Sequence, residues 1–284
     1  MAMSTRSEVR EFLTTRRARI TPAMAGVTDF GTERRVPGLR RAEVAALAGV
    51  SVEYYTRLER GDIAGASDGV LDGIADALQL DDVERAHLHD LARNAAPAPV
   101  KKRRQAEKSG VPASVQRVLD GMDAAVIVYD TRQNLVAANA LGRALYAPHF
   151  DTDGQPNIAR FVYLDSRAKD FYVDYALARR TLSAIMRMDA GRNPLDAELT
   201  AVIGELSVRS PEFRTDWARH DVKVHTHGVK EFRHPEVGVI EFEWDVFQLP
   251  AAPGLSIVSY PVQPGTVSAE RMALLASWAA TDGS

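Results

Sequence analysis

Basic and polar residues gather between residues 39 and 61, in the stretch LRRAEVAALAGVSVEYYTRLERG. A helix pair that enters a DNA groove needs a short first helix, a tight turn with a small residue, and a second helix whose outer face reaches base edges. Here Ala45 is small where the two helices would cross, and Gly49 can adopt the positive φ angle of the turn. Val50 and Leu58 would fill the space between the helices. The stretch therefore predicts a helix-turn-helix.

The outward positions of the second helix are the side chains that could read bases. Ser51 can cap this helix, whose amides and positive dipole end favour a phosphate or a base edge. Arginine pairs with guanine, glutamate accepts from the cytosine amino group, and valine contacts the thymine methyl group. Basic residues before the motif and at its start are typical of phosphate contacts, which fix register without reading sequence. The predicted DNA-binding residues are Arg34, Arg35, Arg40 and Arg41 at phosphates, and Ser51, Val52, Glu53, Tyr54 and Arg57 at the groove.

Some residues of the motif keep a structural alternative open. Tyr55 suits the core and the groove equally, and Glu59 and Arg60 fit an ion pair or a cap better than a base contact. A helical hairpin without a role at DNA is the alternative for the whole stretch. The turn, the spacing and the closing residues coincide, which favours DNA binding.

The elements around the motif predict two domains. Residues 1–96 predict an all-α bundle of about five helices, because apolar residues recur there at helical spacing. Residues 97–112 are expected to form a linker, since prolines and a basic run from Lys101 to Arg104 interrupt both helical and strand periodicity. The run is a solvated linker or, alternatively, a linker that also touches phosphates.

Residues 113–284 predict an α+β domain with an antiparallel sheet. Short alternating or apolar runs bounded by turn residues predict strands over 124–130, 134–140, 222–232, 238–249 and 255–262. Helical spacing fills much of 141–218, and a last helix is expected over 268–280. Strands, then helices, then strands are typical of a sheet packed with helices.

Composition and charge exclude several classes of protein. The 284 residues contain no cysteine, which excludes disulfides and thiolate metal sites. No apolar run approaches the ~20 residues of a membrane span, and the polar start lacks a signal peptide core, so we expect a cytoplasmic protein without a membrane partner. Residues 1–66 hold 11 Lys and Arg against 8 Asp and Glu, whereas residues 111–284 hold 17 against 22. Only the first part is therefore expected to meet double-stranded DNA.

The motif residues Gly49-Val50-Ser51 and Leu58-Glu59-Arg60-Gly61 resemble the XRE-type, lambda-repressor-like helix-turn-helix family. Over nearly its whole length the chain resembles regulators that join this motif to a MmyB-like, PAS-like ligand-binding domain. Further marks of this resemblance are VLDGIADALQLDDVERAHLHDLAR, NIARFVYLD, SPEFRTDWARHDV, THGVKEFRHPEVG and PGTVSAERMALLASWA. It implies a transcription regulator whose second domain binds a small apolar ligand, with a fatty acid as the leading candidate. Arg41 departs from the glutamine that many members carry there.

A pocket for such a ligand would be lined by apolar residues, with a cation or hydrogen-bond donor at its mouth for a carboxylate. Each apolar candidate suits an ordinary core equally well. The predicted ligand-binding residues are Arg160, Phe161, Tyr163, Met186, Arg209, Phe213, Trp217 and His220.

Alternatives to this regulator follow from other features. His225, His227 and Glu231 have the spacing H-x-H-x3-E, which resembles the first metal motif of a cupin barrel. The residues after Gly238 contain no histidine to complete such a site, so we expect no metal. The second domain could also serve dimerisation alone. A homodimer is expected in each case, since one helix-turn-helix buries little surface on DNA. Without a phosphate loop or a nucleophile elbow, neither catalysis nor a cofactor is expected.

Overall fold

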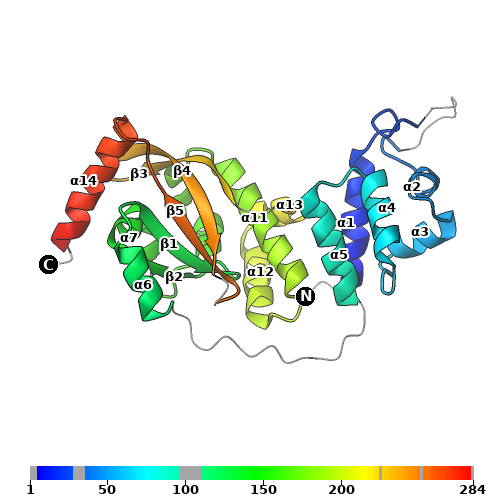
Figure 1. The fold of residues 1–284 in the computed structure, drawn as a ribbon, viewed down its shortest axis with the longest axis horizontal. Helices are drawn as coiled ribbons and strands as arrows, with labels where there is room; N and C mark the ends of the chain where they lie inside the picture. The colour runs from blue at the N-terminus through cyan, green and yellow to red at the C-terminus, as the bar shows by residue number, and fades with distance from the viewer. Residues whose placement is uncertain (1–4, 28–35, 96–110, 224–225, 250–251, 283–284) are drawn as a thin grey trace. The chain divides into compact units, whose positions relative to one another are not determined.

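A computed structural model describes residues 5–27, 36–95, 111–223, 226–249 and 252–282 (Figure 1). Its contacts divide the chain into two units. The first, which we call the helical unit, consists of Met1–Lys101, Ser183–Thr200 and Thr215–Val224. The second, the sheet unit, consists of Lys102–Leu182, Ala201–Arg214 and His225–Ser284. Two segments from the second half of the chain therefore belong to the same unit as the N-terminal helices.

The N-terminal part of the helical unit is the helical bundle that the sequence predicts. Its helices are α1 (Thr5–Arg19), α2 (Arg41–Leu47), α3 (Val52–Glu59), α4 (Asp68–Ala77) and α5 (Asp82–Ala95). Asp81 begins the last of them, because its carboxylate accepts the Glu84 backbone N–H at 2.8 Å. The core combines Phe12 and Leu13 of α1 with Met188 and Val222, which come from the two later segments.

The sheet unit is an α+β domain, as predicted, and its described residues form a five-stranded antiparallel sheet (Figure 1). The strands, in the spatial order β2-β1-β5-β4-β3, are β1 (Ala125–Asp130), β2 (Leu135–Ala138), β3 (His227–His234), β4 (Gly238–Gln248) and β5 (Leu255–Tyr260). The predicted hairpin of β1 and β2 is confirmed. Its turn is held by the Asp130 carboxylate, which accepts the backbone N–H groups of Arg132 and Asn134, each at 2.9 Å.

Helices precede, interrupt and follow the strands. They are α6 (Ala113–Asp120), α7 (Ala140–Leu145), α8 (Ala147–Phe150), α9 (Ile158–Leu164), α10 (Ala168–Phe171), α11 (Tyr175–Arg192), α12 (Ala197–Arg209), α13 (Pro211–Trp217) and α14 (Val267–Asp282). Helix α14 lies beside β4, where the Ser268 hydroxyl accepts the Glu241 N–H at 3.0 Å and Arg271 donates to the Val239 carbonyl. These bonds satisfy backbone groups in the first half of β4, before the residues that pair with β5.

The prediction that the third strand begins at Val222 is wrong, because the strand begins at His227. Val222 is buried in the core of the helical unit. Alternating apolar residues resemble a strand in sequence, but here the first of them packs against helices. Residues 224 and 225 lie outside the described part of the chain.

Asn139 holds the start of the sheet unit together. Its Oδ1 accepts the N–H groups of Val126 at 3.0 Å and Gly142 at 2.7 Å. Its Nδ2 donates to the carbonyls of Met122 and Ala124, at 3.2 and 2.8 Å. A Cβ atom at Gly142 would overlap the Val126 carbonyl, so glycine allows α7 to lie directly on β1.

We expect Asn139→Ala to lower the free energy of unfolding of the sheet unit by about 2–4 kcal/mol, since buried backbone groups would lose their partners. Urea unfolding followed by far-UV circular dichroism measures this loss. Gln155→Ala, at an exposed amide that donates to the Leu135 carbonyl, is the control and should cost less than about 1 kcal/mol. Equal losses in the two variants would contradict the role of Asn139.

Candidate DNA-binding and ligand-binding sites

The turn between α2 and α3 has the geometry that the sequence predicts. Gly49 has a φ angle of 67°, in the left-handed region that favours glycine. The Gly49 N–H donates to the Ala46 carbonyl at 3.3 Å, and the Val50 N–H donates to the Ala45 carbonyl at 3.0 Å. These two bonds are the Schellman pattern, which ends α2 and satisfies its last carbonyls. The chain can therefore reverse within a few residues and begin α3.

The predicted base-reading residues lie on one exposed part of α3. The Ser51 hydroxyl caps the helix by accepting the Tyr54 N–H at 3.1 Å, and Val52 and Glu53 follow it on the surface. The Arg57 guanidinium lies 4.9 Å from the centre of the half-buried Tyr54 ring, which limits the directions that this arginine can take. The helix thus presents a cation in its last turn, on an aromatic ring that lies about one turn after the cap.

A buried carboxylate fixes the end of α3. Glu59 is 1% exposed and receives the guanidinium groups of Arg17 from α1, at 2.5 Å, and of Arg41 from the start of α2. The hydroxyl of the buried Tyr55 donates to the same carboxylate at 3.3 Å. Burial, and then the charge of Glu59, raise the pKa of Tyr55 well above its usual value. Tyr55 is therefore core, and the partners of Glu59 are Arg17 and Arg41.

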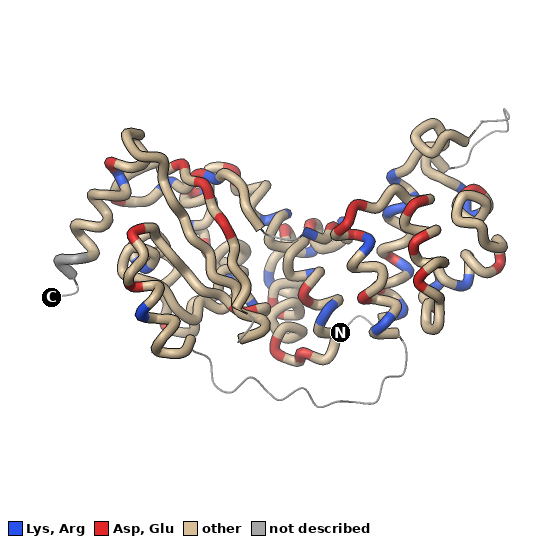
Figure 2. Tube along the Cα trace, in the orientation of Figure 1, with Lys and Arg blue, Asp and Glu red and all other residues tan. Residues whose placement is uncertain are grey.

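The predicted phosphate-binding residues have different outcomes. Arg41 is half-exposed at the start of α2, where Glu59 holds it in place. Arg40 precedes this helix, and its N–H is accepted by Glu43 at 2.6 Å. Arg34 and Arg35 lie outside the described residues. In the sheet unit, acidic residues are spaced along strand β4 (Figure 2). The surface that β4 forms is therefore unsuited to a polyanion such as DNA.

The predicted ligand-binding residues do not gather in one unit. Arg160, Phe161, Tyr163, Arg209 and Phe213 belong to the sheet unit, whereas Met186, Trp217 and His220 belong to the helical unit. Both Arg160 and Arg209 form ion pairs with Glu205, at 2.9 and 2.7 Å. Tyr163 packs edge-on against Phe213, and its hydroxyl donates to the Arg179 carbonyl at 2.6 Å. These contacts stabilise the fold, and the two arginines already hold a carboxylate.

The interior of the sheet unit contains an aromatic cluster of which the sequence analysis identified only Phe161. We call the following residues the aromatic interior: Tyr146, His149, Phe161, Phe171, Tyr172, Phe232, Phe242 and Tyr260. The His149 ring stacks on Phe161, with centroids 3.8 Å apart, and its Nε2 lies 2.9 Å from the Tyr172 hydroxyl. The hydroxyls of Tyr146 and Tyr260 are 2.5 Å apart. Burial lowers the pKa of His149 to about 3 and raises those of the three tyrosines.

A lysine adjoins the aromatic interior. The ammonium group of Lys230 lies 4.4 Å from the Trp244 ring centre and within 6 Å of the rings of Phe232 and Tyr260. Alternation along β3 places Lys230 on the same face of the sheet as the buried Phe232. This alternation was visible in the sequence and could have identified the lysine.

The described part of the chain bears on three further kinds of site: surface hollows, metal sites and membrane spans. A surface hollow of about 230 Å³ lies beside β2, between Leu135, Phe150 and Arg143. The described residues form no group of three or more metal-ligating side chains. Of the cupin-like triplet, His227 and Glu231 are exposed on β3, and His225 lies outside the described residues. No described helix combines the length and the apolar character that a membrane span requires.

Comparison with known families identifies both parts of the chain. Residues 8–88 match the model of a helix-turn-helix domain, and residues 111–275 match that of the MmyB-like transcription regulator ligand binding domain. The second model alone covers more than half of the chain. The chain belongs to the MmyB-like transcription regulators. No curated protein matches this MmyB-like regulator in sequence. It is a DNA-binding transcription regulator with a ligand-binding domain.

Replacing Arg57 tests the DNA surface. We expect Arg57→Ala to weaken binding to a duplex selected by the wild type by about 1–3 kcal/mol and to relax the preference at one base position. Repeating the selection from a random-sequence library with the variant measures both effects. Arg93→Ala, which removes an exposed arginine from α5, is the control for lost charge. Uniform weakening over all sequences would contradict a base contact.

The buried histidine predicts an acid-sensitive sheet unit. Folded His149 stays neutral down to about pH 3, whereas the unfolded chain takes up a proton below about pH 6.5. The stabilisation is therefore complete above about pH 6.5 and is lost as the pH falls towards 3. Between pH 7 and pH 5 we expect His149 to account for about 2 kcal/mol of lost stability. Urea unfolding at both pH values should show a smaller loss in His149→Phe than in the wild type or in His227→Gln.

Proposed function

We propose that this MmyB-like regulator binds operator DNA as a homodimer and responds to a fatty acid held in the aromatic interior of its sheet unit. Dimerisation would place two α3 helices at half-sites about 34 Å apart. The protein would act where the DNA lies, in the cytoplasm. Its ligand would change DNA binding only through different affinities for two states of the protein.

The observation that carries the ligand proposal is Lys230 beside the aromatic interior. A fatty acid needs an apolar surface for its chain and a cation or hydrogen-bond donor for its carboxylate. The rings supply the apolar surface, and Lys230 supplies a cation on the inner face of β3. The hydroxyls of Tyr146 and Tyr260 lie in the same region and are hydrogen-bonded to each other, so one of the two has an O–H left to donate. Arg160 and Arg209, which the sequence analysis proposed for the carboxylate, both pair with Glu205.

Two mass-spectrometric measurements on the purified protein test this proposal. Native mass spectrometry of the intact protein gives the mass of the assembly, and mass spectrometry of an organic extract identifies any bound lipid. We expect a dimeric mass and about one fatty acid per chain, or uptake of added palmitate to that ratio. Lys230→Met should lower the bound amount at least tenfold. Arg143→Met, beside the surface hollow at β2, is the matched control and should leave it unchanged.

Other results would contradict the position of the ligand, its chemical class or the oligomeric state. If Arg143→Met rather than Lys230→Met loses the lipid, the ligand lies in the surface hollow. If the wild type carries no lipid and takes up no palmitate, the fatty acid is the wrong ligand class, and a domain used for dimerisation alone gains support. A monomeric mass at micromolar concentration would contradict the homodimer.

A further inference from the structure

Helix α1 carries charged residues on two opposite faces. Successive residues of an α-helix are rotated by about 100°, so Arg17 points about 180° away from Glu8 and Arg6 about 160° away from it. Arg6 and Arg17 contact the end of the DNA-reading helix α3. Glu8 and the neighbouring residues of its face contact the two later segments of the helical unit. We call these the α3 face and the clasp face of α1.

The α3 face determines where the DNA-reading helix ends. Arg17 pairs with Glu59 and also donates to the Leu39 carbonyl at 2.8 Å, just before α2. Arg6 donates to the Arg60 carbonyl at 3.3 Å. A Cβ atom at Gly61 would overlap the backbone of Arg6, so α1 and the residues after α3 are in direct backbone contact. A shift of α1 would therefore displace α3 and Arg41 with it.

The clasp face holds a buried arginine from α11. Arg187 is 1% exposed and pairs with Glu8, which is itself mostly buried. Its guanidinium also donates to the Trp217 carbonyl and lies 4.0 Å from the centre of the Trp217 ring. Although burial opposes ionisation, the His220 imidazole, whose Nδ1 lies 3.9 Å from Glu8, and the charge of Arg187 lower the pKa of Glu8 to about 2. Glu8 is therefore charged at neutral pH and must keep its partners.

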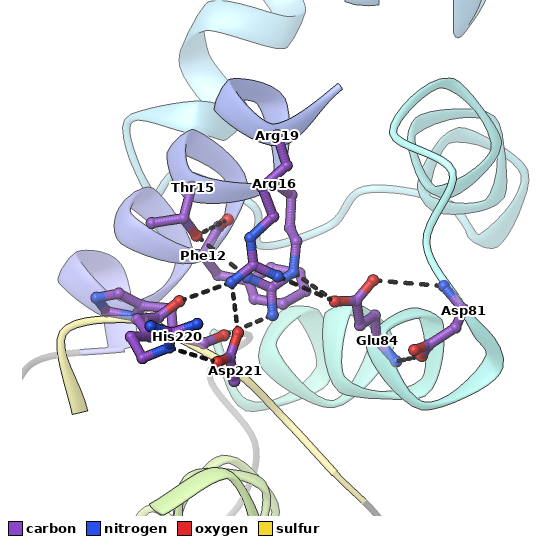
Figure 3. A network of polar contacts seen from close by, with 9 residues as sticks. Phe12, Thr15, Arg16, Arg19, Asp81, Glu84, His220 and Asp221 are labelled. Atoms are coloured by element: carbon purple, nitrogen blue, oxygen red, sulfur yellow. Dashed lines mark hydrogen bonds and ion pairs between the residues drawn. The ribbon is translucent and has the colours of Figure 1, made fainter. Parts of the chain in front are cut away.

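A second group of contacts continues along the clasp face (Figure 3). The buried Arg16 donates to the His220 carbonyl at 2.6 Å and forms an ion pair with Glu84 of α5 at 2.7 Å. His220 is buried in a left-handed conformation, with φ at 52°, and its Nε2 lies 3.0 Å from Glu11. Arg19 forms an ion pair with Asp221. The segment after α13 is thus fixed to α1 at several places.

Two side chains of α5 also contact the backbone of α11 at Gly191. A Cβ atom at Gly191 would lie 2.5 Å from the ring of His87, so this position of α11 admits only a glycine without rearrangement. Asn94 donates to the Gly191 carbonyl at 2.5 Å. All of these segment residues lie within the range that matches the ligand-binding domain family. Part of the ligand-binding domain therefore packs as part of the DNA-binding unit.

From these contacts we propose that α1 couples ligand binding to DNA binding, with Arg187 and His220 as the positioning residues on its clasp face. The inference rests on the proposed response to a ligand and adds the route by which that response reaches α3. A change in the segments that contain Arg187 and His220 moves α1 through Glu8, Glu11 and Arg16. Helix α1 passes the movement to Glu59 and Arg41 through its opposite face.

DNA affinity of the full chain, with and without palmitate, tests this proposal. The probe is a duplex that the wild type selects from a random library. Palmitate is expected to change the wild-type Kd by about fivefold or more, within the usual range of allosteric coupling. Arg187→Met and His220→Asn should reduce this factor towards one, and asparagine suits the left-handed conformation at position 220. Arg85→Met, which removes ion pairs with Asp72 and Asp76 on the α4 side of α5, is the matched control.

Comparing the palmitate-induced change in Kd between variants separates a role in coupling from a role in stability. A role in stability alone would weaken DNA binding equally in both conditions and leave the factor unchanged, which would overturn the proposal. If native mass spectrometry shows that the wild type binds no palmitate, the proposal that the ligand is a fatty acid is wrong. Amide exchange without ligand then tests whether the contacts of the clasp face stabilise α3. Faster exchange in α3 of Arg187→Met than of Arg85→Met would support the route through α1. Equal exchange would contradict it.

Discussion

The Glu59 carboxylate is almost completely buried where the DNA-reading helix ends, and a buried charge of this kind is stable only with its partners in place. Arg17 supplies one partner from α1 and Arg41 supplies the other from the start of α2. The two helices of the motif and α1 are therefore fixed by one carboxylate. The surface that the sequence predicts to meet DNA depends on this arrangement, since Arg41 is one of the predicted phosphate-binding residues.

Helix α1 also carries buried charged residues on the face opposite to Arg17, and these too need partners. Glu8 and Arg16 are charged groups with little exposure to water, and their partners come from α5 and from segments more than 150 residues away. Without residues 183–200 and 215–224, Glu8 would lose Arg187, and Arg16 would lose the His220 carbonyl and keep Glu84 of α5. The DNA-binding unit is thus larger than the region that matches the helix-turn-helix family. In the sheet unit, by contrast, hydroxyls, an imidazole and aromatic rings form a largely uncharged interior, which Lys230 adjoins.

Features that depend on neighbouring residues could be predicted from the sequence. Gly49 allows the turn, Ser51 caps α3, and alternation identifies β4 and β5, because each of these properties depends on backbone geometry over a few residues. Partners that are distant in sequence could not be predicted. Nothing local indicates that Glu205 holds Arg160, 45 residues away in the chain, and Arg160 was therefore assigned to a ligand. The pair of Glu205 with Arg209 is local, since four residues on α12 separate the two, and this spacing was overlooked.

Two further differences have distinct causes. Val222 continues an alternating run in sequence, yet a helical core buries it, so the predicted strand is longer than the real one. Lys230 was overlooked although the same alternation places it on the inner face of β3. A lysine on a buried face contradicts the usual pattern of strands and could have indicated a site.

Native-state amide exchange at increasing urea concentrations tests the central claim, that residues 183–200 and 215–224 fold as one unit with α1. In the full chain, peptides from α1 and from residues 215–223 should lose protection together, at one urea midpoint, because each holds charges of the other. Loss of protection in residues 215–223 while α1 and α3 remain fully protected would show that the N-terminal helices are complete without them, and would contradict the account.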